Sequence, residues 1–158
     1  MPRERRYRAP SRELEAVEYI FEIKSWRPSY LIAVTRDGSR EAPHDEYLSL
    51  HLEARCLSPK VVSGRLVEIE IKGTRDVADP LLSADYPDRE PKRIGVLALP
   101  AHGGQFSMYI PHDSFRCLLS GLAARVFCYI TLLGQPLREG RAACIAASLD
   151  HSIEREAV

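Results

Sequence analysis

Two histidines bracket a short apolar run in the sequence PAHGGQFSMYIPHD, which occupies residues 100–113. A pair of histidines can hold zinc or transfer protons, provided that both side chains reach the same point. The run QFSMYI predicts a strand, and six extended residues separate His102 from His112 by about 20 Å. Zinc ligands each lie about 2 Å from the metal. The spacing excludes a shared site within one chain, so we expect His102 in a glycine-assisted turn and His112 at a strand-to-helix junction.

A denser polar group is expected on two neighbouring strands. In YLSLHLEARC and RLVEIEIKG, polar and apolar residues alternate, so each strand should have one buried and one solvated face. If the connection SPKVVSG makes these strands an antiparallel hairpin, the solvated faces bring an imidazole and three carboxylates together: His51, Glu53, Glu68 and Glu70. Such a polar cluster could bind a cation or perform acid-base chemistry. Arg55 and Lys72 flank it, which is equally typical of a solvated sheet face neutralised by cross-strand pairs.

No sequence motif of a well-known enzyme class occurs in the chain. The patterns GxGxxG, GxxxxGK[ST], GxSxG and HExxH are absent, and Gly103-Gly104 precedes a predicted strand rather than a helix. We therefore predict no catalytic residue, no metal and no cofactor, although an enzyme whose residues converge only in the folded chain stays an alternative. The four cysteines form no CxxC motif and stand in apolar stretches, so we expect buried, reduced thiols.

The first residues form a basic segment. Residues 1–12 contain five arginines with one interleaved tyrosine. Four of these arginines lie between Pro2 and Pro10 and could hold a phosphate backbone or an acidic partner: Arg3, Arg5, Arg6 and Arg8. The whole chain has 22 basic and 22 acidic residues, so no overall field favours nucleic acids or membranes. A short basic tail is more often a solubilising end, and nucleic-acid binding by this arm is the less favoured hypothesis.

A long proline-containing segment interrupts the strand pattern at residues 74–92. Pro80, Pro87 and Pro91 exclude a regular central strand there. Loops of this length without regular structure are usually functional or disordered. Three apolar residues stand among its prolines and aspartates: Leu81, Leu82 and Tyr86. They could dock on the parent sheet or form a binding loop for another chain.

Further strands are expected on both sides of the hairpin. Upstream, VEYIFEIKSW and SYLIAVTRDG predict two strands with a turn at residues 26–29. The first of them also fits a short N-terminal helix, because residues 14–21 contain a helical apolar face and Ser11 could cap it. Downstream, RIGVLALP, QFSMYIP, RVFCYITLLG and RAACIAASL predict four more strands.

One helix is predicted at residues 114–124. Its apolar face consists of residues spaced three or four apart, namely Phe115, Leu118, Leu119 and Leu122. Asp113 or Ser114 could cap its first turn.

These elements predict one β-rich domain over residues 13–151, between a basic, flexible arm at residues 1–12 and a tail at residues 152–158. The favoured fold is an antiparallel β-sandwich or flattened barrel of seven to eight strands with one short helix. The alternative is an α+β domain with the N-terminal helix added. The sequence shows no signal-peptide pattern and no apolar run long enough to span a membrane, so we expect a cytoplasmic protein without a membrane partner.

Three classes of function are compatible with this sequence. The favoured one is a noncatalytic protein-binding or assembly module that contacts another protein or its own copy through a sheet face or the residue 74–92 loop. The second is a nucleic-acid-associated protein that uses the arginine arm. The third is a small enzyme or ligand-binding barrel built around the polar cluster.

Overall fold

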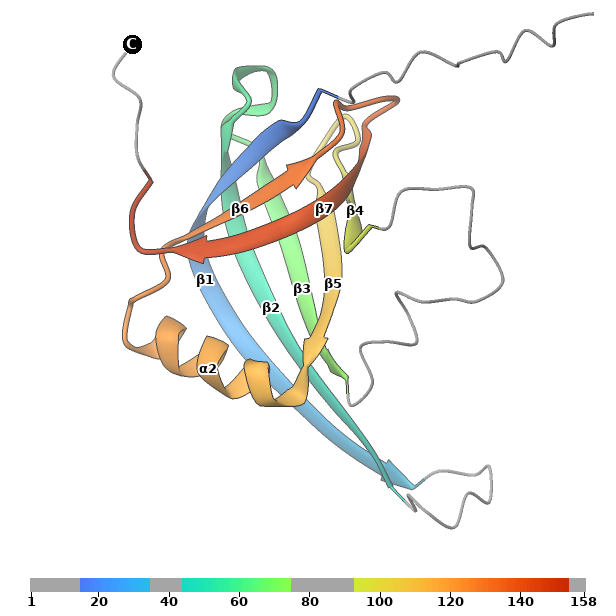
Figure 1. Cartoon of the computed structure of the whole chain (residues 1–158), viewed down its shortest axis with the longest axis vertical. Helices are drawn as coiled ribbons and strands as arrows, with labels where there is room; N and C mark the ends of the chain where they lie inside the picture. The colour runs from blue at the N-terminus through green and yellow to red at the C-terminus, as the bar shows by residue number, and fades with distance from the viewer. Residues whose placement is uncertain (1–14, 35–43, 75–92, 154–158) are drawn as a thin grey trace, which may run out of the picture.

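The computed structural model describes residues 15–34, 44–74 and 93–153, which form a closed barrel of seven strands (Figure 1). In chain order the strands are β1 (Val17–Val34), β2 (His44–Ser58), β3 (Leu66–Thr74), β4 (Gly95–Ala98), β5 (Gln105–Pro111), β6 (Tyr129–Gly134) and β7 (Arg141–Asp150). The 3-10 helix η1 (Lys60–Val62) joins β2 to β3, and the α-helix α2 (His112–Ala123) joins β5 to β6. The predicted mainly β fold with one short helix is confirmed, in the form of a barrel.

The strands follow the order β1-β2-β3-β5-β4-β7-β6 around the barrel, and β6 pairs with β1 again. All neighbours are antiparallel except β3 and β5, which run parallel. The wall is weakest between β4 and β5, where Ala98 and Gln105 form the one pair in register. Beyond the short strand β4, the last residues of β5 and β7 are not paired with each other in the described part of the chain.

The predicted hairpin of β2 and β3 is confirmed. Its inward residues are almost inaccessible to solvent: Leu50, Leu52, Ala54 and Cys56 from β2, and Val67, Ile69 and Ile71 from β3. The register places His51 opposite Glu70 and Glu53 opposite Glu68. This is the pairing expected if the connection SPKVVSG joins the two strands symmetrically. Period-two alternation therefore determined both the buried faces and the pairing of these two strands.

Aromatic side chains fill the barrel, and α2 lies across one of its ends (Figure 1). Tyr19 and Phe21 of β1, Phe106 of β5 and Phe115 of α2 are each at most 2% exposed. The buried Tyr19 hydroxyl donates a hydrogen bond to the carbonyl oxygen of Gln135 at 2.6 Å, which satisfies its polar end.

The sequence-based prediction of two strands before residue 40 is wrong, because β1 runs without a turn from Val17 to Val34. The residues expected in the turn pair with β2 instead, Trp26 with Leu52 and Ser29 with Ser49. A register shift between Ile23 and Ser25 bends the strand without ending it. Pro28 is tolerated because this half of β1 has a strand neighbour on one side alone among the described residues, so its missing N–H leaves the ladder intact.

The alternative N-terminal helix is also wrong from Val17 onward. Tyr19 and Phe21 point into the core, whereas their neighbours Glu18 and Ile20 are less buried, which is a strand alternation. Pairing with β6 over residues 17–22 fixes this conformation. Tertiary pairing has thus overridden a helical spacing that was equally compatible with the local sequence.

The helix α2 begins two residues earlier than predicted and ends one residue earlier. Its N-cap is Pro111, which makes no side-chain cap hydrogen bond, so the prediction that Asp113 or Ser114 caps the helix is wrong. Both residues lie within the first turn, where the negative charge of Asp113 interacts favourably with the helix dipole. The apolar face is confirmed by the burial of Phe115, Leu118 and Leu122.

The four cysteines are free thiols in two different environments. Cys56 and Cys144 are buried, as expected, and burial raises the pKa of each thiol to about 11. The same expectation is wrong for Cys117, which is exposed, and for Cys128, which is half-buried. Cys117 stands two positions after the buried Phe115 and is therefore off the core-facing side of α2.

Candidate functional site

The strands β1 and β2 continue beyond the barrel as a two-stranded ribbon (Figure 1). β6 pairs with β1 only over residues 17–22, and β3 reaches no further than Leu48 along β2. From there the two strands have each other as neighbours, with Leu31 opposite Tyr47 and Val34 opposite His44. Residues 25–34 of β1 together with the opposite residues 44–53 of β2 are called the β1–β2 ribbon below; β3 still pairs with residues 48–53, so the part made of two strands alone is residues 31–34 with residues 44–47. A ribbon of two strands is only marginally stable in water by itself, so its surface is suited to being covered.

Large apolar side chains are exposed along the β1–β2 ribbon. Ten such side chains are exposed in the described part of the chain, and half of them belong to the ribbon: Trp26, Tyr30, Leu31, Ile32 and Tyr47. Tyr30, Leu31, Ile32 and Tyr47 are each between 53% and 58% exposed. A concentration of this kind marks an interaction surface, whereas isolated exposed apolar residues are ordinary.

Both faces of the ribbon carry these side chains. Residues directly opposite each other in an antiparallel pair share a face. Trp26 and Tyr30 lie opposite Leu52 and Leu48, on the face that continues the barrel interior. Leu31 lies opposite Tyr47 on the other face.

The outer edge of β1 along the ribbon is an open strand edge among the described residues. Open edges can pair with a further strand, and proteins restrain them with prolines, bulges and charges. Here Pro28, the bulge at Lys24 and the exposed Arg27 supply such features. At the base of the ribbon, the Lys24 Nζ lies 2.6 Å from Glu22 Oε2 and lowers the pKa of that carboxyl group.

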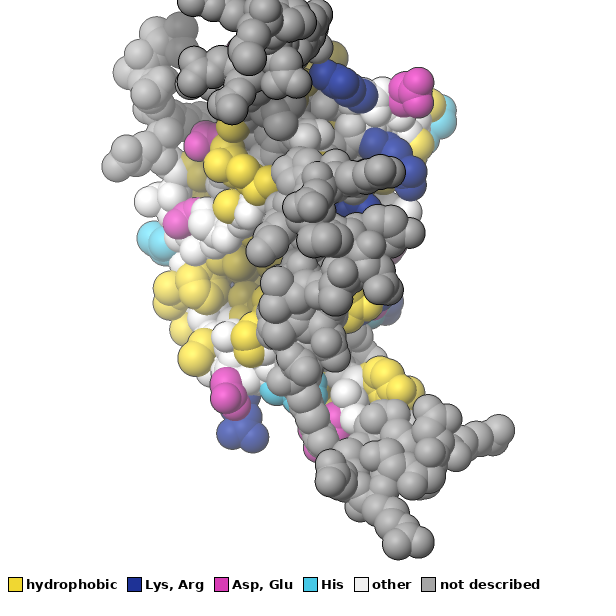
Figure 2. All heavy atoms as spheres, turned by 45° about the vertical axis from the view of Figure 1, so that its right-hand side comes forward, with side chains coloured by type: hydrophobic (Ala, Val, Ile, Leu, Met, Phe, Trp, Pro, Cys, Tyr) yellow, Lys and Arg dark blue, Asp and Glu magenta, His cyan; other side chains and the backbone are white. Residues whose placement is uncertain are grey.

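Figure 2 shows hydrophobic side chains on one side of the molecule, interspersed with charged ones. Val61 and Tyr109 belong to the exposed apolar residues outside the ribbon. They stand on η1 and β5, far apart in the fold, and do not form a second row of the same kind.

The four residues of the predicted polar cluster lie together on the outer face of β2 and β3, where Glu70 lies close to His51 and Lys72. The His51 Nε2 lies 3.9 Å from Glu70 Oε1, and the Lys72 Nζ lies 3.3 Å from Glu70 Oε2. The Ser25 hydroxyl donates a hydrogen bond to Glu53 Oε2 at 3.3 Å. Contacts of this kind between neighbouring side chains are ordinary on a solvated sheet face.

A groove of about 280 Å³ lies beside this cluster. His51, Glu68 and Glu70 line it from one side, and Ser107 of β5 and Arg141 of β7 from the other. Glu53 is not among the lining residues. Within the described ranges, no group of three or more His, Cys, Asp or Glu side chains is placed to hold a metal ion. The groove combines both signs of charge, which suits a polar ligand rather than a cation.

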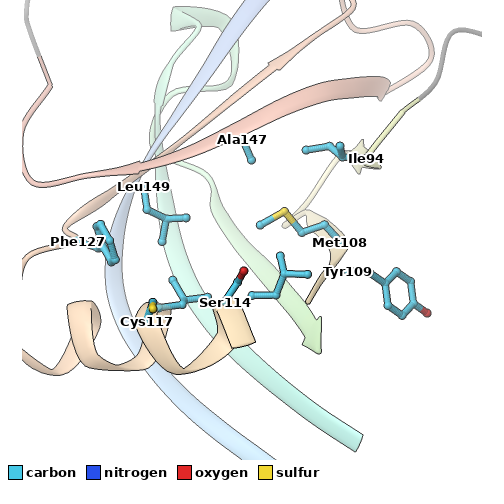
Figure 3. A pocket seen from close by; sticks show the side chains of 10 residues that line it. Ile94, Met108, Tyr109, Ser114, Cys117, Phe127, Ala147 and Leu149 are labelled. Atoms are coloured by element: carbon cyan, nitrogen blue, oxygen red, sulfur yellow. The ribbon is translucent and has the colours of Figure 1, made fainter. Parts of the chain in front are cut away.

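A second, larger groove of about 430 Å³ opens between β5, β7 and α2 (Figure 3). It lies where the wall lacks pairing beyond β4, and its lining is apolar, with Ile94, Met108, Ile110, Leu118, Phe127 and Leu149 among its residues. Ser114 and Cys117 contribute the polar atoms from the helix side, while the Tyr109 ring points away from the centre of the groove. This apolar groove could hold an apolar side chain or ligand.

The two histidines flanking QFSMYI lie in separate places, as the sequence predicts. His102 is exposed in the turn between β4 and β5, and His112 opens α2, with the extended strand β5 between them. The His112 ring packs against Gly73, and its Nδ1 lies 3.9 Å from Glu46 Oε2. Its Nε2 is buried and has no hydrogen-bond partner among the residues that the structure describes.

Two further sets of predicted site residues lie outside the described residues. These are the arm arginines Arg3, Arg5, Arg6 and Arg8, and the loop residues Leu81, Leu82 and Tyr86. The ribbon residues were not identified as a site from the sequence. The alternation of polar and apolar residues predicts a strand, but it does not show where the neighbouring strand ends and leaves that strand exposed. Their one sequence signal is the run YLIAV, in which apolar residues follow one another without alternation.

No protein-family model matches this chain, no curated protein is significantly similar to it, and no solved structure matches its fold significantly. In the described part of the chain, no helix has the length and apolar character needed to cross a membrane.

Proposed function

We propose that this chain is a noncatalytic protein-binding module that assembles with a second copy of itself through the β1–β2 ribbon. The observation that supports this proposal is the concentration of exposed apolar side chains on the ribbon, next to an open strand edge. Covering Tyr30 and Ile32, which share one face of the ribbon and are each more than half exposed, would contribute about 1–2 kcal/mol per side chain.

A second copy fits this surface better than a strongly charged partner. The chain has no net charge, so two copies do not repel each other over long distances. Two copies related by a two-fold axis can place the same apolar ribbon face to face, which is how most homodimers bury one shared patch. Pro28 removes one donor from the open edge and disfavours an unlimited edge-to-edge sheet, so packing between ribbon faces is the expected contact.

Removing the ribbon's apolar side chains should abolish this assembly. We expect the variant Tyr30→Ser/Ile32→Ser to dissociate at concentrations where the unchanged protein is a dimer, with a dissociation constant raised about 10- to 100-fold. Light scattering coupled to size-exclusion chromatography over a range of concentrations measures this change. Both residues are exposed, so far-ultraviolet circular dichroism should show an unchanged fold.

The matched control is Val61→Ser on η1, where the apolar side chain is 82% exposed and lies off the ribbon. Its dimerisation should equal that of the unchanged protein. A protein that stays monomeric at every concentration, or a dimer that persists in Tyr30→Ser/Ile32→Ser, would contradict assembly through the ribbon. A monomer would direct the search toward a different protein as the partner.

A further inference from the structure

The apolar groove between β5, β7 and α2 has no charged side chain in its lining, and the folded core leaves it open. Ile94 just before β4, Met108 of β5 and Leu149 of β7 face it (Figure 3), and Leu118 of α2 also lines it. Water in such a groove makes few hydrogen bonds, and an apolar side chain placed there is favoured by the hydrophobic effect.

We propose that the groove is the docking site for residues 75–92 of the same chain, with Leu81, Leu82 and Tyr86 as the side chains that enter it. The first support is the position of the two points where the described chain stops and resumes. Thr74 pairs with Pro111, the residue after the groove residue Ile110. The chain resumes at Arg93, immediately before Ile94, which also lines the groove.

The described chain resumes at Arg93, and the fixed position of the next residue, Ile94, places this point beside the groove. The Ile94 backbone N–H donates a hydrogen bond to the Cys144 carbonyl oxygen at 2.8 Å, directly before the pairing of β4 with β7. The eighteen residues between Thr74 and Arg93 can extend to about 60 Å, so their length does not restrict a return to the groove. A segment whose two ends flank one groove meets that groove at a high effective concentration.

The chemistry of the segment matches the groove. Its two adjacent leucines follow Pro80, its tyrosine precedes Pro87, and the short spacer Ser83-Ala84-Asp85 separates them. Prolines reduce the number of conformations that must be given up when a segment docks. The groove in turn offers apolar side chains, with Ser114 and Cys117 as the polar groups at its helix side. This proposal is independent of assembly through the ribbon, because the ribbon contributes no residue to the groove.

Cross-linking tests the proposal directly, because the native thiol of Cys117 lies in the groove and is exposed. We expect Leu82→Cys in the full chain to form an intramolecular cross-link to Cys117 with a short bis-maleimide, mapped by mass spectrometry. The matched control Val61→Cys, which is exposed elsewhere, should form none. Absence of the Leu82→Cys product, or its equal yield in the control, would overturn the proposal.

Binding of an anilinonaphthalene sulfonate dye provides a second test that does not need an engineered thiol. We expect Leu81→Ser/Leu82→Ser/Tyr86→Ser to bind several times more dye than the unchanged protein, because the apolar groove is then free. The control Asp79→Ser/Asp85→Ser/Asp88→Ser keeps the apolar residues and should bind no more. Equal dye binding by both variants would overturn the proposal. So would an intermolecular cross-link, which indicates a second copy in the groove, or a small molecule retained in native mass spectra, which indicates a ligand.

Discussion

The substitution Phe21→Ala is expected to lower the free energy of unfolding by about 3–5 kcal/mol. Phe21 is completely buried in the barrel, on the part of β1 that pairs with both β2 and β6. Its removal deletes apolar contacts and leaves a cavity that the surrounding strands cannot fill, because a closed barrel restrains their movement. Urea unfolding followed by circular dichroism measures the change.

Leu31→Ala is the matched control on the same strand. Leu31 is 58% exposed on the ribbon, so monomeric protein should lose no more than about 0.5 kcal/mol. Comparable losses in the two variants would show that the first half of β1 is not the inner wall of the barrel. The experiment is done at low concentration, where assembly through the ribbon does not add to stability.

Alkaline conditions should destabilise the protein through its two buried thiols. Burial raises the pKa of Cys56 and of Cys144 from the ordinary value of 9.0 to about 11 in the folded protein. The folded state therefore retains protons that the unfolded state releases. This contribution to stability is complete below pH 9 and is lost as the pH rises toward 11. A difference of two pKa units corresponds to a change of up to about 100-fold in the folding equilibrium for each thiol.

The double variant Cys56→Ala/Cys144→Ala isolates this effect. Its stability at neutral pH should be lower, but its further loss between pH 9 and pH 11 should be smaller than in the unchanged protein. Cys117→Ala serves as the control, because it removes an exposed thiol and leaves both buried ones in place. An alkaline loss that is the same in all three proteins would mean that other groups, such as the buried Tyr19, account for it.

The hairpin of β2 and β3 could be predicted from the sequence because its information is local. Alternation fixes which residues are buried, and a short connection fixes which strand pairs with which. The opposition of His51 to Glu70 followed from these two facts alone. The apolar face of α2 was predictable for the same reason, since helical spacing is a property of neighbouring residues.

The course of β1 could not be predicted, because it depends on residues distant in sequence. Trp26, Arg27 and Pro28 resemble a turn, and only the length of β2 decides that they remain in a strand. The parallel pairing of β3 with β5 likewise depends on β4 being placed on the far side of β5, which no local pattern encodes. Strand order in a barrel is set by the packing of the whole core.

The candidate sites divide in the same way. The polar cluster was predictable because its residues belong to one hairpin. The β1–β2 ribbon and the apolar groove, in contrast, both lie where the pairing between neighbouring strands ends. The ribbon is exposed because β3 and β6 end before β1 and β2 do, and the apolar groove is open because β4 is only four residues long. Strand ends of this kind are set by the partner strand, so Tyr30 and Phe127 could not be identified as surface or groove residues beforehand.

Hydrogen exchange of the unchanged protein at low and at high concentration tests the central claim, assembly through the β1–β2 ribbon, most directly. We expect the amides of residues 25–34 to exchange more slowly at high concentration, because a second copy shields the ribbon from solvent. Amides of β7 should exchange at the same rate in both samples. Exchange along residues 25–34 that does not depend on concentration, in samples where light scattering shows a dimer, would contradict the claim.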